Sequence, residues 1–376
     1  MRKKALILFD GAHLAYSPTV IGLYDSLAEH FDVGILAENP EAFDFERLTT
    51  RRVIYRDKLK NQNRLRIYRR IFDFLAIFDK QIAWLRQMNF DTDVIYDFTV
   101  VRRQIRAESP DIIIAVDFRN LLYAQILDKP VEFLSLEIVP GDKFYQECDF
   151  KNIRSVVIQT KERYEHLFGK RQLKTFLVQN APVYVAAAEN NLNRRNLVYC
   201  GTAWNPFGFY HCLEFLRAFP EYTMRVKGAI SNEDKRRTES EYADLLSAKR
   251  LIFDSEYLDD AVVVDYLRQF RIGFCFYNFE LEQVNNFNYQ SAPSGKMFKY
   301  MAAGVPTIGQ DILGLQPVKE FDCGVLIADL EPASIRAAIE KIEKNFDYYS
   351  QNCLKAAAYY SFDKTVKSFV DYLTGK

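Results

Sequence analysis

The sequence predicts an α/β fold made of two doubly wound, Rossmann-like domains that face each other across a cleft. Short apolar segments alternate with helical patterns along most of the chain, as they do in βαβ units that build parallel sheets. The segment 112–116 is apolar at every position, which is typical of a strand buried on both faces. The length of 376 residues corresponds to about two domains of roughly 150 residues.

The N-terminal series opens with a strand at 5–9, which ends at Asp10-Gly11 and leads into a helical pattern that runs to Phe31. A strand at 33–36, closed by Asn39-Pro40, completes the first βαβ unit. Further strands of this series are expected at 112–116, 132–136 and 156–159.

A segment without periodicity at 183–195 is rich in Asn and small residues, so we expect the interdomain linker there. The second series has expected strands at 196–200, 222–227, 250–254, 272–276 and 305–308, and expected helices at 209–219, 233–248, 260–269, 295–303 and 332–344. The predicted domains are a first Rossmann-like domain at 1–190, a second at 191–360, and a helix at 361–376 that packs back on the first domain.

Composition excludes several classes of protein. The 50 basic and 50 acidic residues cancel, which excludes a globally basic nucleic-acid binder, and 49% hydrophobic with 27% charged residues is typical of a globular protein. The six cysteines are scattered without a metal-binding spacing, so we expect reduced thiols. The apolar stretch at 5–9 is too short for a signal peptide, and we expect a cytoplasmic protein.

Charge is concentrated in one segment. Residues 47–70 contain ten basic residues and one acidic residue, and the apolar positions that follow at helical spacing are Ile67, Ile71, Phe74, Leu75, Phe78, Ile82 and Leu85. A basic segment next to an apolar helix face suits an anionic membrane surface or a polyanionic ligand. The alternative is a surface helix whose apolar stripe packs on the N-terminal sheet, and both interpretations stay open.

The most informative segment is 291–308, which predicts a helix that begins at Pro293-Ser294-Gly295 and ends at Gly304. A helix N-terminus that begins with Ser-Gly exposes backbone N–H groups and a partial positive charge, which favour phosphate. Lys296 lies in the first turn, where the helix dipole disfavours a cation unless an anion binds beside it. The alternative is that Ser294 is only an N-cap and Lys296 a solvated side chain.

Lys296-Met-Phe-Lys-Tyr-Met-Ala-Ala-Gly-Val-Pro-Thr-Ile308 resembles the motif of retaining nucleotide-sugar glycosyltransferases of the GT-B architecture, the group with two glutamates eight positions apart. Weaker similarities extend over most of the chain, including Val178-Gln-Asn-Ala-Pro182 and Leu197-Val-Tyr-Cys-Gly201. The resemblance implies a GT-B fold, with an acceptor-side domain at 1–190 and a nucleotide-sugar donor domain at 191–360.

Two departures from that family concern the donor. The family's two glutamates fall at Ser291 and Lys299, and its basic pair after the first strand of the second domain is missing from 201–208. A lysine cannot accept a hydrogen bond from a ribose hydroxyl, so either the donor geometry differs here or donor binding is weakened. Lys227, Lys296 and Lys299 are the candidates to supply positive charge instead, and the resemblance places Tyr257 near the base.

Candidates in the N-terminal domain follow strand ends. The resemblance places Glu137 where the family has a histidine that contacts the donor sugar; the alternative is a loop cap. Asp117 and Arg119 follow the preceding strand and form either a site or a salt-bridged pair. Gly11 permits close approach of a ligand, and His13 is either an acid or base for an acceptor hydroxyl or a structural residue.

The resemblance implies a hexosyltransferase-type glycosyltransferase that moves a sugar from a nucleotide-diphosphate donor to a glycan or lipid-linked acceptor with retention, in bacterial surface polysaccharide assembly such as capsule or lipopolysaccharide. Ser294, Gly295 and Lys296 stabilise the departing diphosphate, and no metal or other cofactor is expected. The aromatic and amide-rich loop 276–290, which includes Tyr277, suits sugar recognition or is a surface loop. The alternatives are a non-catalytic relative that binds a nucleotide sugar or glycan as scaffold or regulator, and a nucleotide-sugar epimerase.

Overall fold

The computed structural model describes residues 2–11, 14–38, 48–57, 59, 61–138, 150–183, 196–256, 258 and 260–376. The chain divides into two compact units. Unit 1 comprises Met1–Ile158, Leu167–Leu177 and Val366–Lys376, and unit 2 comprises Gln159–His166 and Val178–Thr365. The domain bounds drawn from the sequence stay a prediction, and most of the expected linker, 184–195, lies outside the described residues.

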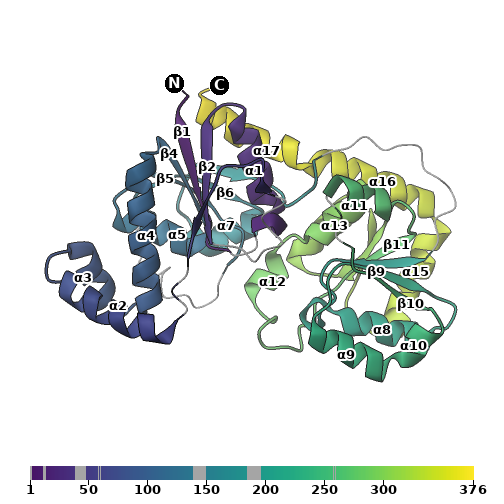
Figure 1. Cartoon of the computed structure of the whole chain (residues 1–376). Coiled ribbons are helices and arrows are strands. Elements are labelled where there is room, and N and C mark those ends of the chain that lie inside the picture. The colour runs from purple at the N-terminus through teal and green to yellow at the C-terminus, as the bar shows by residue number, and fades with distance from the viewer. Residues whose placement is uncertain are drawn as a thin grey trace. The chain divides into compact units, whose positions relative to one another are not determined.

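Unit 1 contains a seven-stranded sheet in the order β3-β2-β1-β4-β5-β6-β7 (Figure 1). Its strands are β1 (Lys4–Leu8), β2 (Asp32–Glu38), β3 (Val53–Arg56), β4 (Ile112–Val116), β5 (Val131–Leu134), β6 (Ile153–Ile158) and β7 (Thr175–Leu177). Every pairing within it is parallel. Chain order reverses between β1 and β4, so these two strands form the switch point of a doubly wound sheet.

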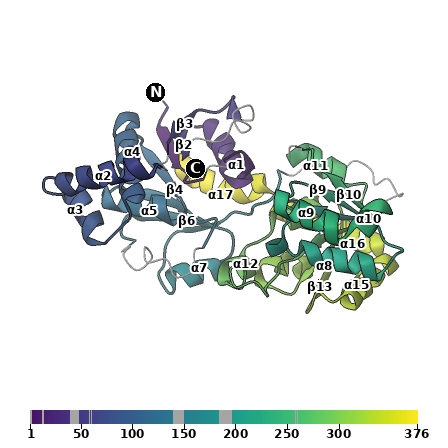
Figure 2. The same ribbon diagram turned by 60° about the horizontal axis from the view of Figure 1, so that its bottom comes forward.

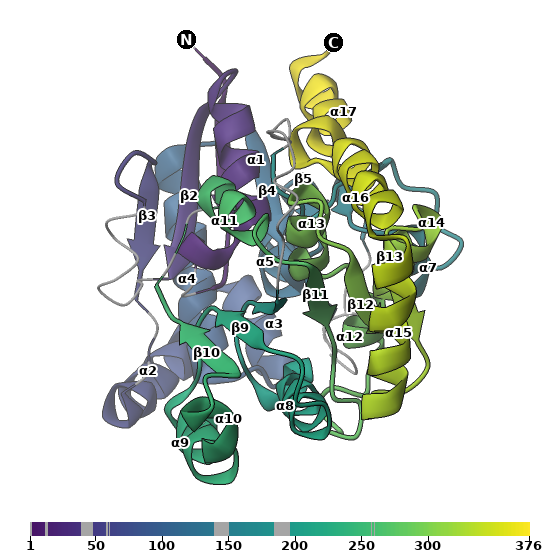
Figure 3. The same ribbon diagram turned by 90° about the vertical axis from the view of Figure 1, so that its right-hand side faces the viewer.

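The helices of unit 1 cover both faces of this sheet. They are α1 (Pro18–Ala28), α2 (Gln62–Leu75), α3 (Lys80–Gln87), α4 (Thr92–Glu108) and α5 (Asp117–Ile126). Figures 1 and 3 show α1 on one face and α4 with α5 on the other, as right-handed crossovers require. The helices α2 and α3 lie beyond α4, away from the sheet (Figure 2). The single helical segment expected across 67–85 is therefore two helices.

Unit 2 repeats the same strand order in a six-stranded sheet, β10-β9-β8-β11-β12-β13. Its strands are β8 (Leu197–Cys200), β9 (Met224–Lys227), β10 (Leu251–Asp254), β11 (Ile272–Cys275), β12 (Thr307–Gln310) and β13 (Gly324–Ile327), all paired in parallel. Here the chain order reverses between β8 and β11. The predicted α/β class with two doubly wound sheets is confirmed.

The helices of unit 2 are α8 (Phe209–Ala218), α9 (Asn232–Glu241), α10 (Ala243–Ser247), α11 (Asp260–Leu267), α12 (Phe287–Ser291), α13 (Gly295–Ala302), α14 (Gln316–Glu320), α15 (Pro332–Lys344) and α16 (Phe346–Tyr360). Two further helices, α7 (Lys161–Phe168) and α17 (Phe362–Thr374), contribute residues to both units. The helix expected at 233–248 is two helices, α9 and α10, separated at the buried Tyr242.

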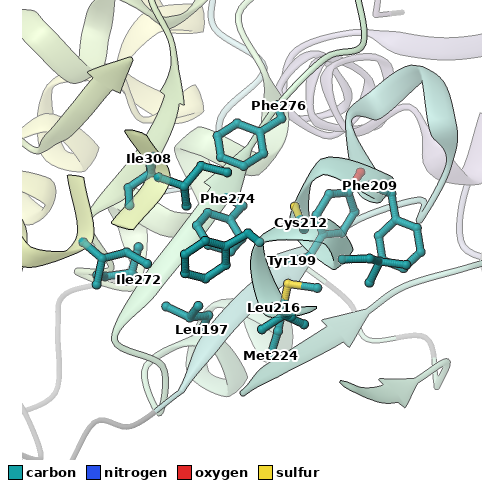
Figure 4. Close-up of a cluster of buried hydrophobic side chains, with 14 of the residues drawn as sticks. Leu197, Tyr199, Phe209, Cys212, Leu216, Met224, Ile272, Phe274, Phe276 and Ile308 are labelled. Carbon is teal, nitrogen blue, oxygen red and sulfur yellow. The ribbon is translucent and has the colours of Figure 1, made fainter. Parts of the chain in front are cut away.

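The sheet of unit 2 is buried on both faces, because alternate residues of its strands point into different clusters. Leu197 and Tyr199 of β8 join α8, α10 and α15 in one cluster, part of which Figure 4 shows. Val198 and Cys200 join α11, α13 and α16 in the other. This two-sided burial explains the continuously apolar strands in the sequence and holds the carboxyl ends of β8 and β11 in place.

Candidate functional site

The helix α13 is fixed tightly against the two strands of the switch point in unit 2. The hydroxyl of Tyr300 accepts the backbone N–H of Cys200 at 2.8 Å, at the end of β8. A Cβ atom built on Gly273 of β11 would lie 2.6 Å from the Tyr300 ring, so only glycine permits this contact. The first turn of α13 is thus held at the carboxyl edge of the sheet, where doubly wound sheets bind ligands.

Lys296 extends from this first turn toward β8. Its Nζ donates to the Tyr199 hydroxyl at 3.1 Å and lies 4.4 Å from the centroid of that ring. It also lies 5.1 Å from the centroid of the Phe207 ring. The aliphatic part of the side chain passes Gly201, where a Cβ would approach Lys296 Cδ to 3.4 Å. Lys296 is therefore held in a defined position between a strand end and an aromatic wall.

The ammonium group of Lys296 is partly desolvated, and no carboxylate of the described residues compensates its charge. Burial lowers its pKa, and among the described residues its electrostatic neighbours are the thiols of Cys275, Cys212 and Cys200. Burial raises the pKa of the Cys212 and Cys275 thiols, so these groups stay neutral. A cation in such surroundings is stabilised when an anion binds beside it.

The start of α13 adds backbone donors to this cation. Ser294 occupies the N-cap position, but its side chain makes no capping hydrogen bond to the helix. A Cβ on Gly295 would lie 3.1 Å from Asn180 Nδ2, so the segment 178–182 lies beside the start of α13. The predicted phosphate site at Ser294, Gly295 and Lys296 thus has one cation and the N–H groups of the first turn on the same helix end.

Two loops form an aromatic wall next to Lys296. The loop after β8 carries Trp204, which is 43% exposed, and Phe207, which lies 6.1 Å from the Tyr277 ring. The loop after β11 is tied to it, because Asn278 Nδ2 donates to Asn205 Oδ1 at 3.0 Å. Tyr277 is buried, so it lies within the wall rather than on its surface. Tyr277 was a candidate from the sequence, whereas Trp204 and Phe207 of the loop 201–208 were not identified as site residues.

Lys227 lies at the end of β9, and it already has a carboxylate partner. Its Nζ is 2.8 Å from Asp254 Oδ1, at the end of β10, and 4.8 Å from the centroid of the Tyr266 ring. Its side chain is only 4% exposed. A donor role for Lys227 stays a prediction, and so does the role of Tyr257, which lies outside the described residues.

The two positions of the family glutamates differ in environment. Ser291 is buried, its Oγ donates to the Phe287 carbonyl at 2.6 Å, and it accepts from Arg163 Nη1 at 3.2 Å. Arg163, which is fully buried, also donates to Asn288 Oδ1 at 3.1 Å. Lys299 is half-buried on α13, one turn after Lys296. Arg163 was missed by sequence reasoning because nothing local links it to a residue 128 positions later.

The switch point of unit 1 is also charged, but its charges are paired. Arg56, at the end of β3, is buried and lies 3.2 Å from Asp10 Oδ1 and 2.9 Å from Asp97 Oδ1. Arg119 Nη1 lies 3.3 Å from Asp10 Oδ2. Burial raises the pKa of Asp97, and Arg56 opposes that shift. A Cβ on Gly11 would lie 2.5 Å from the Phe9 ring, so the close approach that Gly11 permits is made by the Phe9 side chain.

Asp117 organises the segment that carries Glu137. Its Oδ1 accepts the backbone N–H groups of Leu136 at 2.7 Å and Glu137 at 2.9 Å. Asp117 has a φ of +56°, a conformation that aspartate tolerates better than most residues. Glu137 is exposed beside it. The structure therefore brings Asp117 and Glu137 together, pairs Arg119 with Asp10, and leaves His13 outside the described residues.

A pocket of about 410 Å³ lies at the opposite edge of the unit 2 sheet. It is lined by Asn196, Thr223 and Arg271, which directly precede β8, β9 and β11. Arg271 is engaged with Glu343 at 2.8 Å. Since doubly wound sheets bind ligands at the carboxyl edge, this pocket is not the candidate site. Within the described ranges, no group of three or more His, Cys, Asp or Glu is arranged to hold a metal ion.

No protein-family model matches the sequence, and no curated protein matches it either. Solved structures do match over the whole chain. HepE of Anabaena in complex with UDP and glucose is 13% identical, with 100% of both chains covered and a TM-score of 0.69. Sucrose-phosphate synthase of Thermosynechococcus elongatus is 14% identical, with 99% and 98% covered and a TM-score of 0.65.

A UDP-N-acetylglucosamine 2-epimerase is similar to the same extent, at 11% identity with 99% of this chain and 96% of that chain covered and a TM-score of 0.60. The chain has the GT-B fold that these proteins share. Because glycosyltransferases and an epimerase both match at low identity, the likeness establishes the fold, and the chemistry has to be argued from the residues of this chain.

Proposed function

We propose that the protein is a glycosyltransferase that moves a sugar from a nucleotide-diphosphate sugar to a glycan or lipid-linked acceptor. The observation that carries the proposal is Lys296, a desolvated cation without a described carboxylate partner, held at the switch point of unit 2 beside the first turn of α13. The solved structures of HepE, which contain UDP, UDP-glucose or UDP with glucose, support a uridine nucleotide as the first donor to test.

In the proposed reaction, the bond between the anomeric carbon and the diphosphate breaks and negative charge develops on the leaving diphosphate. Lys296 and the N–H groups at Ser294 and Gly295 stabilise that charge without having to reorganise. Trp204 offers exposed aromatic surface to the nucleotide or sugar, and the buried Tyr277 supports this aromatic wall from within. Lys299 and Lys227 are secondary sources of positive charge, and Ser291 contributes through the buried contact with Arg163.

Unit 1 is proposed to bind the acceptor. Glu137 is the candidate to orient a sugar hydroxyl or to steady positive charge at the anomeric carbon, and Asp117 holds the backbone of that residue. Retention at the anomeric carbon, metal independence and a role in bacterial surface polysaccharide assembly at the inner face of the plasma membrane belong to the same proposal. NMR spectroscopy of the product anomer tests retention, because an inverted product contradicts it.

The donor site is tested with Lys296→Ala and a control, Lys341→Ala, which removes an exposed lysine from α15 of the same unit. Loss of a charge-assisted contact of about 1.5–3 kcal/mol should weaken UDP binding roughly 10- to 150-fold in Lys296→Ala, measured by calorimetry, and leave the control unchanged. Equal affinities in both variants would remove Lys296 from the site. If no nucleotide or nucleotide sugar stabilises the protein in thermal-shift assays, the donor site itself is wrong.

A non-catalytic protein that binds a nucleotide sugar is the second candidate. The specific observation in its favour is that serine and lysine occupy the positions of the two family glutamates, with Ser291 buried against Arg163. Incubation with UDP-sugars and acceptor glycans separates the candidates. Release of UDP coupled to a longer glycan supports the transferase, a changed sugar on an intact nucleotide supports an epimerase, and tight binding with neither product supports the non-catalytic protein.

A further inference from the structure

One face of α2 is apolar and exposed to solvent, whereas its opposite face is buried against the rest of unit 1. The inner face packs on α4, since Phe72 is 3% exposed and the Tyr68 ring lies 4.9 Å from the ring of Tyr96. The outer face carries Ile67, Ile71 and Phe74, which are 59%, 42% and 61% exposed. The apolar pattern of this segment is therefore not satisfied by packing within unit 1.

The exposed face continues into the turn after α2. Ile77 and Phe78 are 70% and 74% exposed, and the Phe78 ring lies 5.5 Å from that of Phe74. At about 100° per residue, positions 67, 71 and 74 of α2 fall within roughly 60° of one another around the helix axis, and Phe78 joins them through its ring contact with Phe74. Isolated exposed apolar side chains are ordinary, but five large ones gathered on one short segment mark an interaction surface.

The sequence left open whether this stripe is core or membrane-facing, and the structure divides it. Ile82 and Leu85 on α3 are fully buried, so they belong to the core. The exposed side chains of Ile67, Ile71, Phe74, Ile77 and Phe78 do not belong to the core. We name Ile67, Ile71, Phe74, Ile77 and Phe78, with their flanking arginines Arg64 and Arg70, the α2 surface.

Unpaired positive charge borders the α2 surface on both sides. On a helical projection, Arg64 and Arg70 fall about 60° to either side of Ile67, and both are exposed. Among the described residues, neither they nor Arg66 and Arg69 pair with a carboxylate, whereas Arg51 pairs with Asp25 at 2.7 Å. Within the basic segment 47–70, Arg51, Arg52 and Arg56 are therefore paired with carboxylates, whereas the arginines of α2 have no carboxylate partner among the described residues.

The acidic residues near the α2 surface are already neutralised. Asp73 pairs with Arg86, and Asp79 pairs with Arg102 at 2.5 Å. Asn61 caps the helix, because its side chain accepts the N–H groups of Asn63 and Arg64, so the arginines stand on a stable first turn. The net field at this surface is positive, which selects an anionic partner.

We propose that the α2 surface docks the protein on an anionic lipid bilayer. The apolar stripe enters the acyl boundary while Arg64 and Arg70 reach the lipid phosphates, the arrangement of a helix that lies in the interface plane. A nucleic acid would match the arginines but leave five aliphatic and aromatic side chains in water. No helix in the described part of the chain is long and apolar enough to cross a bilayer.

Vesicle flotation tests the proposal with the full chain. The protein should float with vesicles of equimolar phosphatidylcholine and phosphatidylglycerol, and far less with phosphatidylcholine alone. At about 1 kcal/mol for each arginine near anionic lipid, Arg64→Ser with Arg70→Ser should weaken binding on the order of 25-fold. The matched control is Lys235→Ser with Arg236→Ser, which removes two exposed charges from α9 in unit 2.

Phe74→Ser with Phe78→Ser tests the apolar half of the α2 surface. Both side chains are exposed, so the variant should keep its melting temperature and lose flotation. Equal flotation of this variant and the natural protein, or failure of the natural protein to bind anionic vesicles, would overturn the proposal. A concentration-dependent dimer that Phe74→Ser with Phe78→Ser abolishes, without any vesicle binding, would instead identify a second copy of the chain as the occupant.

Discussion

The switch points of the two sheets have the same topology, but they differ in how their charges are balanced. In unit 1, Arg56 and Arg119 meet Asp10 and Asp97, and the charges compensate one another in a buried network. In unit 2, Lys296 stands among neutral thiols and aromatic rings, without a described carboxylate. The charges at the sheet edge of unit 1 are therefore compensated by residues of unit 1 itself, whereas the sheet edge of unit 2 is stabilised when an anion binds.

The largest expected effect tests the compensated edge. Arg56→Ala leaves Asp97 buried without its cation, and breaking a buried ion pair in this way costs about 3–5 kcal/mol. We expect a loss of that size in the free energy of unfolding, measured by urea titration. The control, Arg51→Ala, removes a more exposed partner of Asp25 and should cost less than about 1 kcal/mol. A small, equal loss in both would show that the network in unit 1 does not hold the edge together.

A pH titration of nucleotide binding tests the uncompensated edge. Burial lowers the pKa of Lys296, so its proton leaves at a lower pH than that of an ordinary lysine. An anion binds the protonated form, and UDP affinity should therefore fall as the pH rises through that pKa, by up to about tenfold for each pH unit. Lys296→Arg, which does not titrate in this range, should remove the dependence.

The stability of the ligand-free protein should move in the opposite direction. Between the lowered pKa in the folded state and the ordinary pKa in the unfolded state, the unfolded chain binds more protons. Stability then rises with pH over that window, because the folded state no longer holds a desolvated charge. If affinity and stability both fell with rising pH, Lys296 would not be the group responsible.

The smallest expected effect concerns the segment after β5. Asp117→Ala removes the acceptor of two backbone N–H groups and should cost about 1–2 kcal/mol at most, because water can reach the exposed Glu137. Amide hydrogen exchange should become faster at Leu136 and Glu137. Asp117→Asn keeps an acceptor and the positive φ, so it should restore most of the protection. Unchanged exchange in Asp117→Ala would mean that other contacts order this segment.

The elements that the sequence predicted are those whose signal is local. The strand at 112–116 and the helix start at Gly295 were found because apolar runs and Ser-Gly turns are contiguous patterns. The strands β3, β7 and β13 were missed; each lies at the edge of its sheet and is only partly buried, so it lacks the continuously buried pattern of the interior strands. The expected 233–248 helix is divided at Tyr242, whose φ of −126° and ψ of 29° are not helical and whose hydroxyl donates to Glu214 at 2.6 Å, a contact that no helical pattern encodes.

The candidate site was found in part for the same reason. Lys296 was identified from its place at a helix N-terminus, which is a local property. Its contact with Tyr199 and the burial of Ser291 against Arg163 join residues 97 and 128 positions apart. The exposed face of α2 was undecidable from the sequence, since an apolar stripe has the same spacing whether α4 or water lies beside it.

The thiols around Lys296 have a consequence for how the protein can be observed. Cys200, Cys212 and Cys275 are buried, and burial raises the pKa of Cys212 and Cys275, so these two do not present a reactive thiolate in the folded protein. Alkylating reagents can reach them only when unit 2 opens. The rate at which these three cysteines are alkylated therefore measures how often the region around Lys296 opens. A ligand that keeps this region closed should slow their alkylation, and the assay needs no added label.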